Sequence, residues 1–195
     1  MSEKKNKKII IFASGDGTNV EQIIKFFKNN NEVNIQLILT NNSNAGVLKR
    51  AKKHRIPATF YDNEAFENKI VFEILNSLNP NLIVLAGFIR KIPNTIISRF
   101  PNKIINIHPA LLPSHGGKGM YGNEVHKSVI RSNDSKTGVT IHYVNSDYDK
   151  GEIILQKSIK VDSKDTPDSL FKRVQKLEHK YYPLVIEKLL NEQSG

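Results

Sequence analysis

The chain alternates short apolar segments with longer segments in which apolar residues recur at helical spacing. Several of the apolar segments are nearly continuous in Ile, Val and Leu, which is typical of parallel strands buried on both faces of a sheet. Strands that alternate with helices form a mostly parallel sheet covered by helices. The sequence therefore predicts an α/β fold.

The same pattern places the individual elements. We expect central strands at 8–13, 34–39, 82–86 and 104–107, and two further strands at 138–144 and 153–161. Helices are expected at 18–28, 45–54, 63–78, 93–99, 121–131 and 166–190. The last helix has a clear start signal, because Pro167 follows the polar Thr166. No long internal repeat is present, and 195 residues suit one domain, residues 1–195.

The charge is positive but dispersed. The net charge of +10 comes from 29 Lys and Arg residues against 19 Asp and Glu residues, and a dense basic run lies at residues 4–8. Because the excess is spread along the chain, it indicates a general compositional bias and not a patch for a polyanion, and we expect no nucleic-acid partner. Residues 1–8 are expected to form a disordered basic tail.

Neither a membrane nor an oxidising compartment is indicated. The apolar run at 9–13 is too short for a signal peptide or a membrane span, so the cytoplasm is the expected location. The chain has no cysteine, which excludes disulfides, a thiol nucleophile and thiolate metal sites.

A glycine loop, Ser-Gly-Asp-Gly-Thr-Asn at 14–19, connects the first strand to the first helix. Backbone amides at such a helix start can bind a phosphate, although a tight turn alone also favours glycine. No third glycine completes a dinucleotide fingerprint, and the second strand ends in Thr40 and Asn41 without a ribose-binding acid. A single phosphate monoester fits this loop better than NAD or ATP.

Two polar groups follow later strands. Asn106 and His108 lie on one side of an expected strand, near its carboxyl end, where open α/β sheets bind ligands. An amide beside an imidazole suits acyl transfer, but such a pair is also compatible with a hydrogen-bonded core feature. His142 lies on a later strand, with Asp147 and Asp149 in the next loop. These carboxylates either orient a histidine or belong to an ordinary turn.

The loop at 110–122 is glycine-rich and long enough to indicate function or mobility. Its residues Lys118 and Tyr121, and the nearby His126, receive no role from the sequence. The histidines at 108, 115 and 126 are not at metal-ligand spacing, so we expect no metal site.

These segments, in this order, resemble the glycinamide ribonucleotide formyltransferase family. The stretches that carry the resemblance are SGDGTN (14–19), VLAGFIRKI (84–92), NIHPALLP (106–113), GVTIHYVNSDYDKGEIILQ (138–156) and VQKLEHKYYP (174–183). The resemblance implies a formyltransferase fold with a Rossmann-like, mostly parallel, seven-stranded sheet and helices on both faces. It also implies transfer of the formyl group of 10-formyltetrahydrofolate to the amino group of glycinamide ribonucleotide, in de novo purine biosynthesis.

The resemblance assigns catalysis to Asn106, His108 and Asp149, with His142 in a supporting position. It implies direct attack of the amine through a tetrahedral intermediate, with the oxyanion stabilised by Asn106 and by a His108 that Asp149 keeps protonated. Some members have an arginine near position 64, where this chain has Glu64, so that contact is not transferred.

Binding roles follow from the same resemblance. The nucleotide phosphate is expected at Gly17, Thr18 and Asn19, and Gln175 and Glu178 are expected to meet the phosphate and the ribose. Both substrates are small molecules, and the chain is expected to be a monomer or a homodimer. The expected folate-binding residues are Phe88, Ile89, Arg90, Lys91, Ile92, Asn106, Asp147 and Asp149.

Other functions are less consistent with the sequence. Formyltetrahydrofolate hydrolases carry an added amino-terminal regulatory domain, whereas the resemblance here starts at residue 9. Methionyl-tRNA formyltransferases normally carry a carboxyl-terminal RNA-binding domain, so we do not expect this function for a sequence that ends at Gly195. For a non-enzymatic nucleotide-binding or RNA-binding module, the sequence has no recognisable RNA-binding motif. For a short-chain dehydrogenase, it lacks the YxxxK pair.

Overall fold

The computed structural model describes residues 6–67 and 69–193. Within these residues the strands form one seven-stranded sheet, in the order β3-β2-β1-β4-β5-β6-β7. The strands are β1 (Lys7–Phe12), β2 (Val33–Thr40), β3 (Ala58–Phe60), β4 (Leu82–Leu85), β5 (Ile104–His108), β6 (Lys136–Tyr143) and β7 (Ile153–Lys160). The helices are α1 (Thr18–Phe27), α2 (Gly46–His54), α3 (Asn63–Glu67), α4 (Ile70–Leu78), α5 (Asn94–Arg99), α6 (Asn123–Arg131) and α7 (Pro167–Glu192).

The sheet is mostly parallel. All pairings from β3 to β5 are parallel, whereas β5 pairs with β6, and β6 with β7, in the antiparallel sense. The strand order reverses at β1, which lies between β2 and β4. In open α/β sheets a ligand crevice forms at such a reversal, outside the carboxyl ends of the strands.

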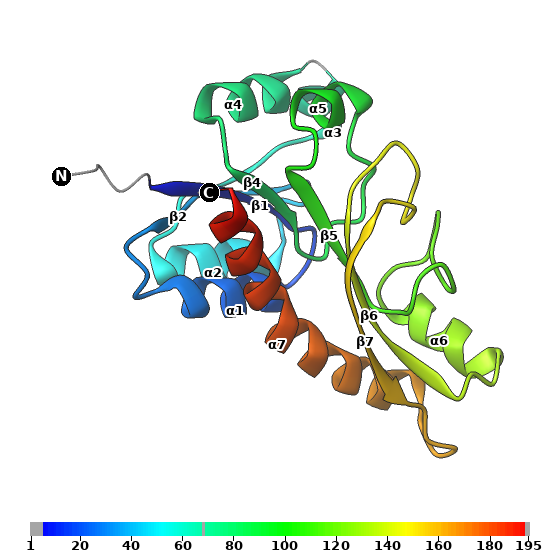
Figure 1. The fold of residues 1–195 in the computed structure, drawn as a ribbon. Helices are drawn as coiled ribbons and strands as arrows, with labels where there is room; N and C mark the ends of the chain where they lie inside the picture. Colours follow the sequence, from blue (N-terminus) through cyan, green and yellow to red (C-terminus); the bar gives the residue numbers. More distant parts are fainter. Residues whose placement is uncertain (1–5, 68, 194–195) are drawn as a thin grey trace.

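Helices cover both faces of the sheet, as predicted. Helices α1, α2 and α7 lie on one face, and α3, α4 and α5 lie on the other (Figure 1). Successive side chains of a strand point to opposite faces, so β1 contributes to both layers. Ile9 and Ile11 pack into the core beneath α1, α2 and α7, whereas Ile10 and Phe12 pack into the core beneath α4 and α5. All four side chains are completely buried.

The structure differs from the predicted elements in two places. The strand β3 was not predicted, because its three residues form a short, largely exposed edge that shows no apolar alternation. The single helix expected at 63–78 is instead two helices, α3 and α4. Lys69, immediately before α4, has a φ of 64°, in the left-handed region that a continuous right-handed helix excludes.

The prediction of a disordered tail at 1–8 was wrong for Lys7 and Lys8. Residues 1–5 lie outside the described residues, but Lys7 and Lys8 form the first two positions of β1. The amide of Lys7 donates to the Glu32 carbonyl at 2.7 Å, and the amide of Lys8 donates to Oδ1 of Asn81 at 2.9 Å. Because both amides are paired, the strand extends further than its apolar residues indicate.

The terminal helix α7 starts where its sequence signal placed it. Pro167 is its first residue, and the Thr166 side chain accepts a hydrogen bond from the Ser169 amide at 3.2 Å. Within residues 6–67 and 69–193, no helix is both long and apolar enough to cross a membrane.

Candidate active site

A cleft of about 750 Å³ lies at the carboxyl ends of β1, β4 and β5. Its walls come from the glycine loop, the segment after β4, the end of β5, the loop before α6, the loop between β6 and β7, and α7. The structure thus gathers into one cleft every site residue predicted from the sequence: Gly17, Thr18, Asn19, Phe88, Ile89, Arg90, Lys91, Ile92, Asn106, His108, His142, Asp147, Asp149, Gln175 and Glu178.

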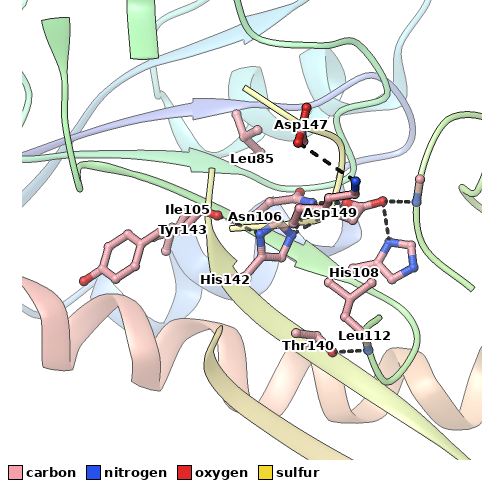
Figure 2. Close-up of polar contacts among 12 residues, drawn as sticks. Leu85, Ile105, Asn106, His108, Leu112, Thr140, His142, Tyr143, Asp147 and Asp149 are labelled. Carbon is pink, nitrogen blue, oxygen red and sulfur yellow. Dashed lines mark hydrogen bonds and ion pairs between the residues drawn. The ribbon is translucent and has the colours of Figure 1, made fainter. Parts of the chain in front are cut away.

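The antiparallel pairing of β5 with β6 places Asn106 opposite His142 (Figure 2). Nδ1 of His142 lies 2.8 Å from the Tyr143 carbonyl, which only accepts hydrogen bonds, so Nδ1 carries the proton. The other ring nitrogen, Nε2 of His142, lies 3.2 Å from Nδ2 of Asn106. The same amide nitrogen lies 3.5 Å from Oδ1 of Asp149. His142 and Asp149 together orient the Asn106 amide.

Asp149 is the centre of this cluster. Its carboxylate oxygens lie 3.6 Å from Nδ1 of His108 and 3.6 Å from Nε2 of His142 (Figure 2). The amide of Gly117 donates to Oδ2 at 2.9 Å. Asp147, two residues earlier, differs strongly, because its side chain is 63% exposed whereas that of Asp149 is 11% exposed. Of the two loop carboxylates, Asp149 alone is held in the polar cluster.

Glycine shapes the loop that carries Asp149. A Cβ atom at Gly151 would lie 1.6 Å from the Tyr143 carbonyl oxygen, so the loop passes too close to β6 for any side chain there. Asp149 itself has a φ of 54°, in the left-handed region. Aspartate tolerates this conformation better than most residues. The turn chemistry that the sequence suggested is therefore real, and it directs a carboxylate into the cleft.

Burial and the neighbouring charges shift the pKa values of Asp149 and His108 in opposite directions. Burial alone would raise the pKa of Asp149, but hydrogen bonding to His142, the charge of His108 and the Gly117 amide together lower the pKa. For His108 the balance is reversed, because burial lowers its pKa by more than Asp149 and the His115 carbonyl raise it. Burial therefore opposes the effect of the Asp149 charge on His108.

The glycine loop packs tightly against α2. Gly17 has a φ of 71°, and a Cβ atom there would lie 2.5 Å from Cγ2 of Val47. The amide of Val47 donates to the Gly15 carbonyl at 3.1 Å. Arg50, further along α2, donates from Nε to the Asp16 carbonyl at 2.6 Å. These contacts hold the turn that precedes the first amides of α1.

Helix α7 closes the other side of the loop. Nε2 of Gln175 donates to the Thr18 hydroxyl at 3.2 Å, and Nδ2 of Asn19 donates to Oε2 of Glu178 at 2.8 Å. Burial raises the pKa of Glu178, and the hydrogen bond from Asn19 partly opposes this. The predicted phosphate and ribose residues are therefore in direct contact, although they come from opposite ends of the chain.

Three residues of this region received no individual role from the sequence. Ser14 donates to Oδ1 of Asn41 at 2.6 Å and accepts from the Ile89 amide at 3.2 Å, linking the glycine loop to the predicted folate segment. The Gly117 amide contacts Asp149, and the His115 carbonyl lies 2.8 Å from Nε2 of His108. Their only signal was their location in, or next to, a glycine-rich loop.

Comparison with known proteins identifies the class. The chain belongs to the formyl transferase family, whose model matches residues 7–186. It is 39% identical over 190 residues to phosphoribosylglycinamide formyltransferase of Bacillus subtilis. The matched region covers 94% of this chain and 95% of the relative. The enzyme of the same name from Escherichia coli is 32% identical over 185 residues, covering 91% of this chain and 84% of the relative.

Solved structures agree with these relatives. The crystal structure of phosphoribosylglycinamide formyltransferase from Bacillus halodurans is 37% identical, with a TM-score of 0.85 over 94% of this chain and 95% of that chain. The structure of the same-named protein from Anaplasma phagocytophilum is 30% identical, with a TM-score of 0.88 over 96% of this chain and 88% of that chain. The family resemblance and the fold predicted from the sequence are confirmed.

Proposed function

We propose that this chain transfers the formyl group of 10-formyltetrahydrofolate to the amino group of glycinamide ribonucleotide. The observation that carries the proposal is that one cleft joins a phosphate-type glycine loop to the cluster of Asn106, His108 and Asp149. A substrate with a phosphate at one end and a nucleophile at the other fits this arrangement. Membership of the formyl transferase family and the names of the relatives support the same reaction.

The nucleotide end of the site is the junction of α1 and α7. The backbone amides of Gly17, Thr18 and Asn19 lie where α1 begins, and helix starts favour anions. Gln175 and Glu178 lie beside this loop on α7 and supply an amide and a carboxylate for the ribose hydroxyls. The phosphate would then be held mainly by backbone groups, which suits a monoester.

The folate end of the site is the segment after β4. Phe88 and Ile92 are buried, whereas Ile89 is 46% exposed and lines the cleft. Arg90 and Lys91 also line it, and Asp147 lies in the loop on its opposite side. An apolar wall with polar groups around it fits a flat, hydrogen-bonding ring system such as a pteridine.

Asn106 is suited to stabilise a developing oxyanion. Its two amide hydrogens face His142 and Asp149, and the 3.5 Å contact with Asp149 is the weaker of the two. A substrate oxygen would replace this weaker contact, while His142 keeps the amide oriented. One such donor contributes about 2.7–4 kcal/mol to a transition state.

His108 and Asp149 are suited to manage the protons. His108 is almost completely buried, which favours its neutral form before the reaction. A negative charge that develops beside it favours the imidazolium form, so His108 takes up the proton of the attacking amine as the tetrahedral intermediate forms. Asp149, whose lowered pKa keeps it ionised, holds a water that relays this proton from His108 to the departing folate nitrogen. No covalent enzyme intermediate is required.

Positioning contributes the rest of the rate. The cleft holds both reactants against each other, and this proximity lowers the barrier by about 7–11 kcal/mol at best. The amine then attacks the formyl carbon directly.

The test is an assay of formyl folate consumption, followed by absorbance, with and without glycinamide ribonucleotide. Consumption that requires the nucleotide supports the transferase. Consumption without the nucleotide would replace the transferase by a hydrolase, and no consumption in either reaction would leave a non-enzymatic binding module. A salt titration against an oligonucleotide separates that last case, because binding to a nucleic-acid backbone weakens steeply with salt.

A further inference from the structure

His115 lies in the loop before α6 and contacts the catalytic cluster through its backbone carbonyl. Its carbonyl oxygen lies 2.8 Å from Nε2 of His108. A carbonyl only accepts hydrogen bonds, so Nε2 of His108 carries a proton. Nδ1 of His108 therefore faces Oδ2 of Asp149, at 3.6 Å, as the nitrogen that gains and loses a proton.

The side chain of His115 is held at both ring nitrogens. Nδ1 lies 2.9 Å from the hydroxyl of Ser128 on α6, and Nε2 lies 2.8 Å from Oδ2 of Asp134, in the turn that follows α6. The ring is 10% exposed, so solvent competes little with these contacts. The backbone of His115 has a φ of 56°, which is rare for a residue with a side chain and persists only where its surroundings hold it.

We propose that His115 is a positioning residue, whose ring, clamped by Ser128 and Asp134, holds the carbonyl that directs Nδ1 of His108 toward Asp149. The catalytic consequence rests on the proposed function, but the positioning itself does not. The proposal explains why a non-glycine residue has a left-handed backbone directly before the Gly116–Gly117 pair. It also gives this part of the glycine-rich loop a defined role.

Several groups around His108 affect its charge. Asp149 and the His115 carbonyl favour its protonated form, whereas burial, the ring of His115, His142 on β6 and His126 on α6 oppose it. Loss of the carbonyl contact would therefore lower the pKa of His108 further. In an enzyme that uses protonated His108, the decline of kcat at high pH would then begin at a lower pH.

The test compares His115→Phe with Asp134→Asn. His115→Phe removes both ring contacts, whereas Asp134→Asn removes the charge but keeps an acceptor oxygen for Nε2. Nitrogen-15 NMR of histidine-labelled protein reports the tautomer of His108 directly. We expect one Nε2–H tautomer in the unaltered protein and in Asp134→Asn, and a mixture in His115→Phe. Ser128→Ala, which removes only one partner of the ring, is expected to retain the single tautomer.

Kinetics provide the second readout. We expect kcat of His115→Phe to fall roughly tenfold, with KM unchanged and the decline of kcat at high pH shifted to lower pH. Asp134→Asn should retain most of the kcat and the pH profile of the unaltered protein. A single Nε2–H tautomer together with an unchanged pH profile in His115→Phe would overturn the proposal.

The two proposals fail in different ways. If the unaltered protein consumed no formyl folate while His115→Phe still lost the single tautomer, the proposed function would fail and the positioning role would stand. If the unaltered protein were active and His115→Phe merely unfolded, its Tm would drop, and Asp134→Asn would decide. A folded Asp134→Asn with a single Nε2–H tautomer and most of its kcat supports the clamp, whereas a mixture of tautomers in folded Asp134→Asn would contradict it.

Discussion

Nδ2 of Asn19 donates a hydrogen bond of 2.8 Å to Oε2 of Glu178, joining the first turn of α1 to the middle of α7 across 159 positions of sequence. The neighbouring bond between Thr18 and Gln175, at 3.2 Å, reinforces the junction. The glycine loop and the terminal helix therefore form a single wall of the cleft. Any change that moves the loop is expected to disturb both of the proposed contacts with the nucleotide.

Gly17→Ala should test how strictly this loop depends on glycine. The φ of 71° disfavours a side chain, and the added Cβ would lie 2.5 Å from Val47. We expect the free energy of unfolding to fall by about 1–3 kcal/mol in a urea titration, with a raised KM for the nucleotide. Gly15→Ala is the matched control, because nothing lies within 4 Å of its added Cβ. Equal effects of the two substitutions would contradict this explanation.

Asn106→Ala and Asp149→Ala should each lower kcat by at least about a hundredfold, with little change in the Kd for folate. The reason is that the first removes the oxyanion donor and the second removes the carboxylate beside His108. Single-turnover formyl transfer measures the chemical step. Asp147→Ala serves as the control, because its exposed side chain is expected to affect folate binding more than kcat. Near-normal turnover in either of the first two variants would remove that residue from the mechanism.

Tyr182→Phe should destabilise the fold without affecting the proposed formyl transfer. Tyr182 is completely buried, and its hydroxyl lies 2.9 Å from the Leu85 carbonyl and 3.3 Å from the Ile105 carbonyl. Its removal leaves these carbonyls with one hydrogen bond fewer, which costs about 1–3 kcal/mol. Urea unfolding measures the change. Tyr181→Phe, next to it and only partly buried, is expected to change the free energy of unfolding by less than about 0.5 kcal/mol.

His126 should make the fold sensitive to acid. It is 1% exposed, and burial lowers its pKa from 6.5 to about 4. Because the unfolded chain binds this proton more readily, the contribution to stability is complete above pH 6.5 and is lost as the pH falls toward 4. The loss is on the order of 3 kcal/mol. His126→Phe should flatten the decline in the free energy of unfolding between these pH values, and an unchanged decline would assign it to other groups.

Local patterns in the sequence were sufficient for most of the fold. Continuous apolar runs predicted the central strands, helical spacing predicted most of the helices, and Thr166 with Pro167 predicted the start of α7. These features follow from short-range physics, because strand and helix periodicities and end signals are encoded within a few residues. The edge strand β3 and the break at Lys69 escaped prediction, since neither leaves an apolar pattern.

The sequence by itself determined which side chains were available: an amide and an imidazole two residues apart on a strand, a glycine loop before a helix, and two loop carboxylates. Only the tertiary structure decided which of them meet. The antiparallel pairing of β5 with β6 places His142 opposite Asn106, and the left-handed backbone at Asp149 turns its carboxylate inward. The structure also lowers the pKa of His108, because burial depends on the whole assembled core and no local spacing encodes it.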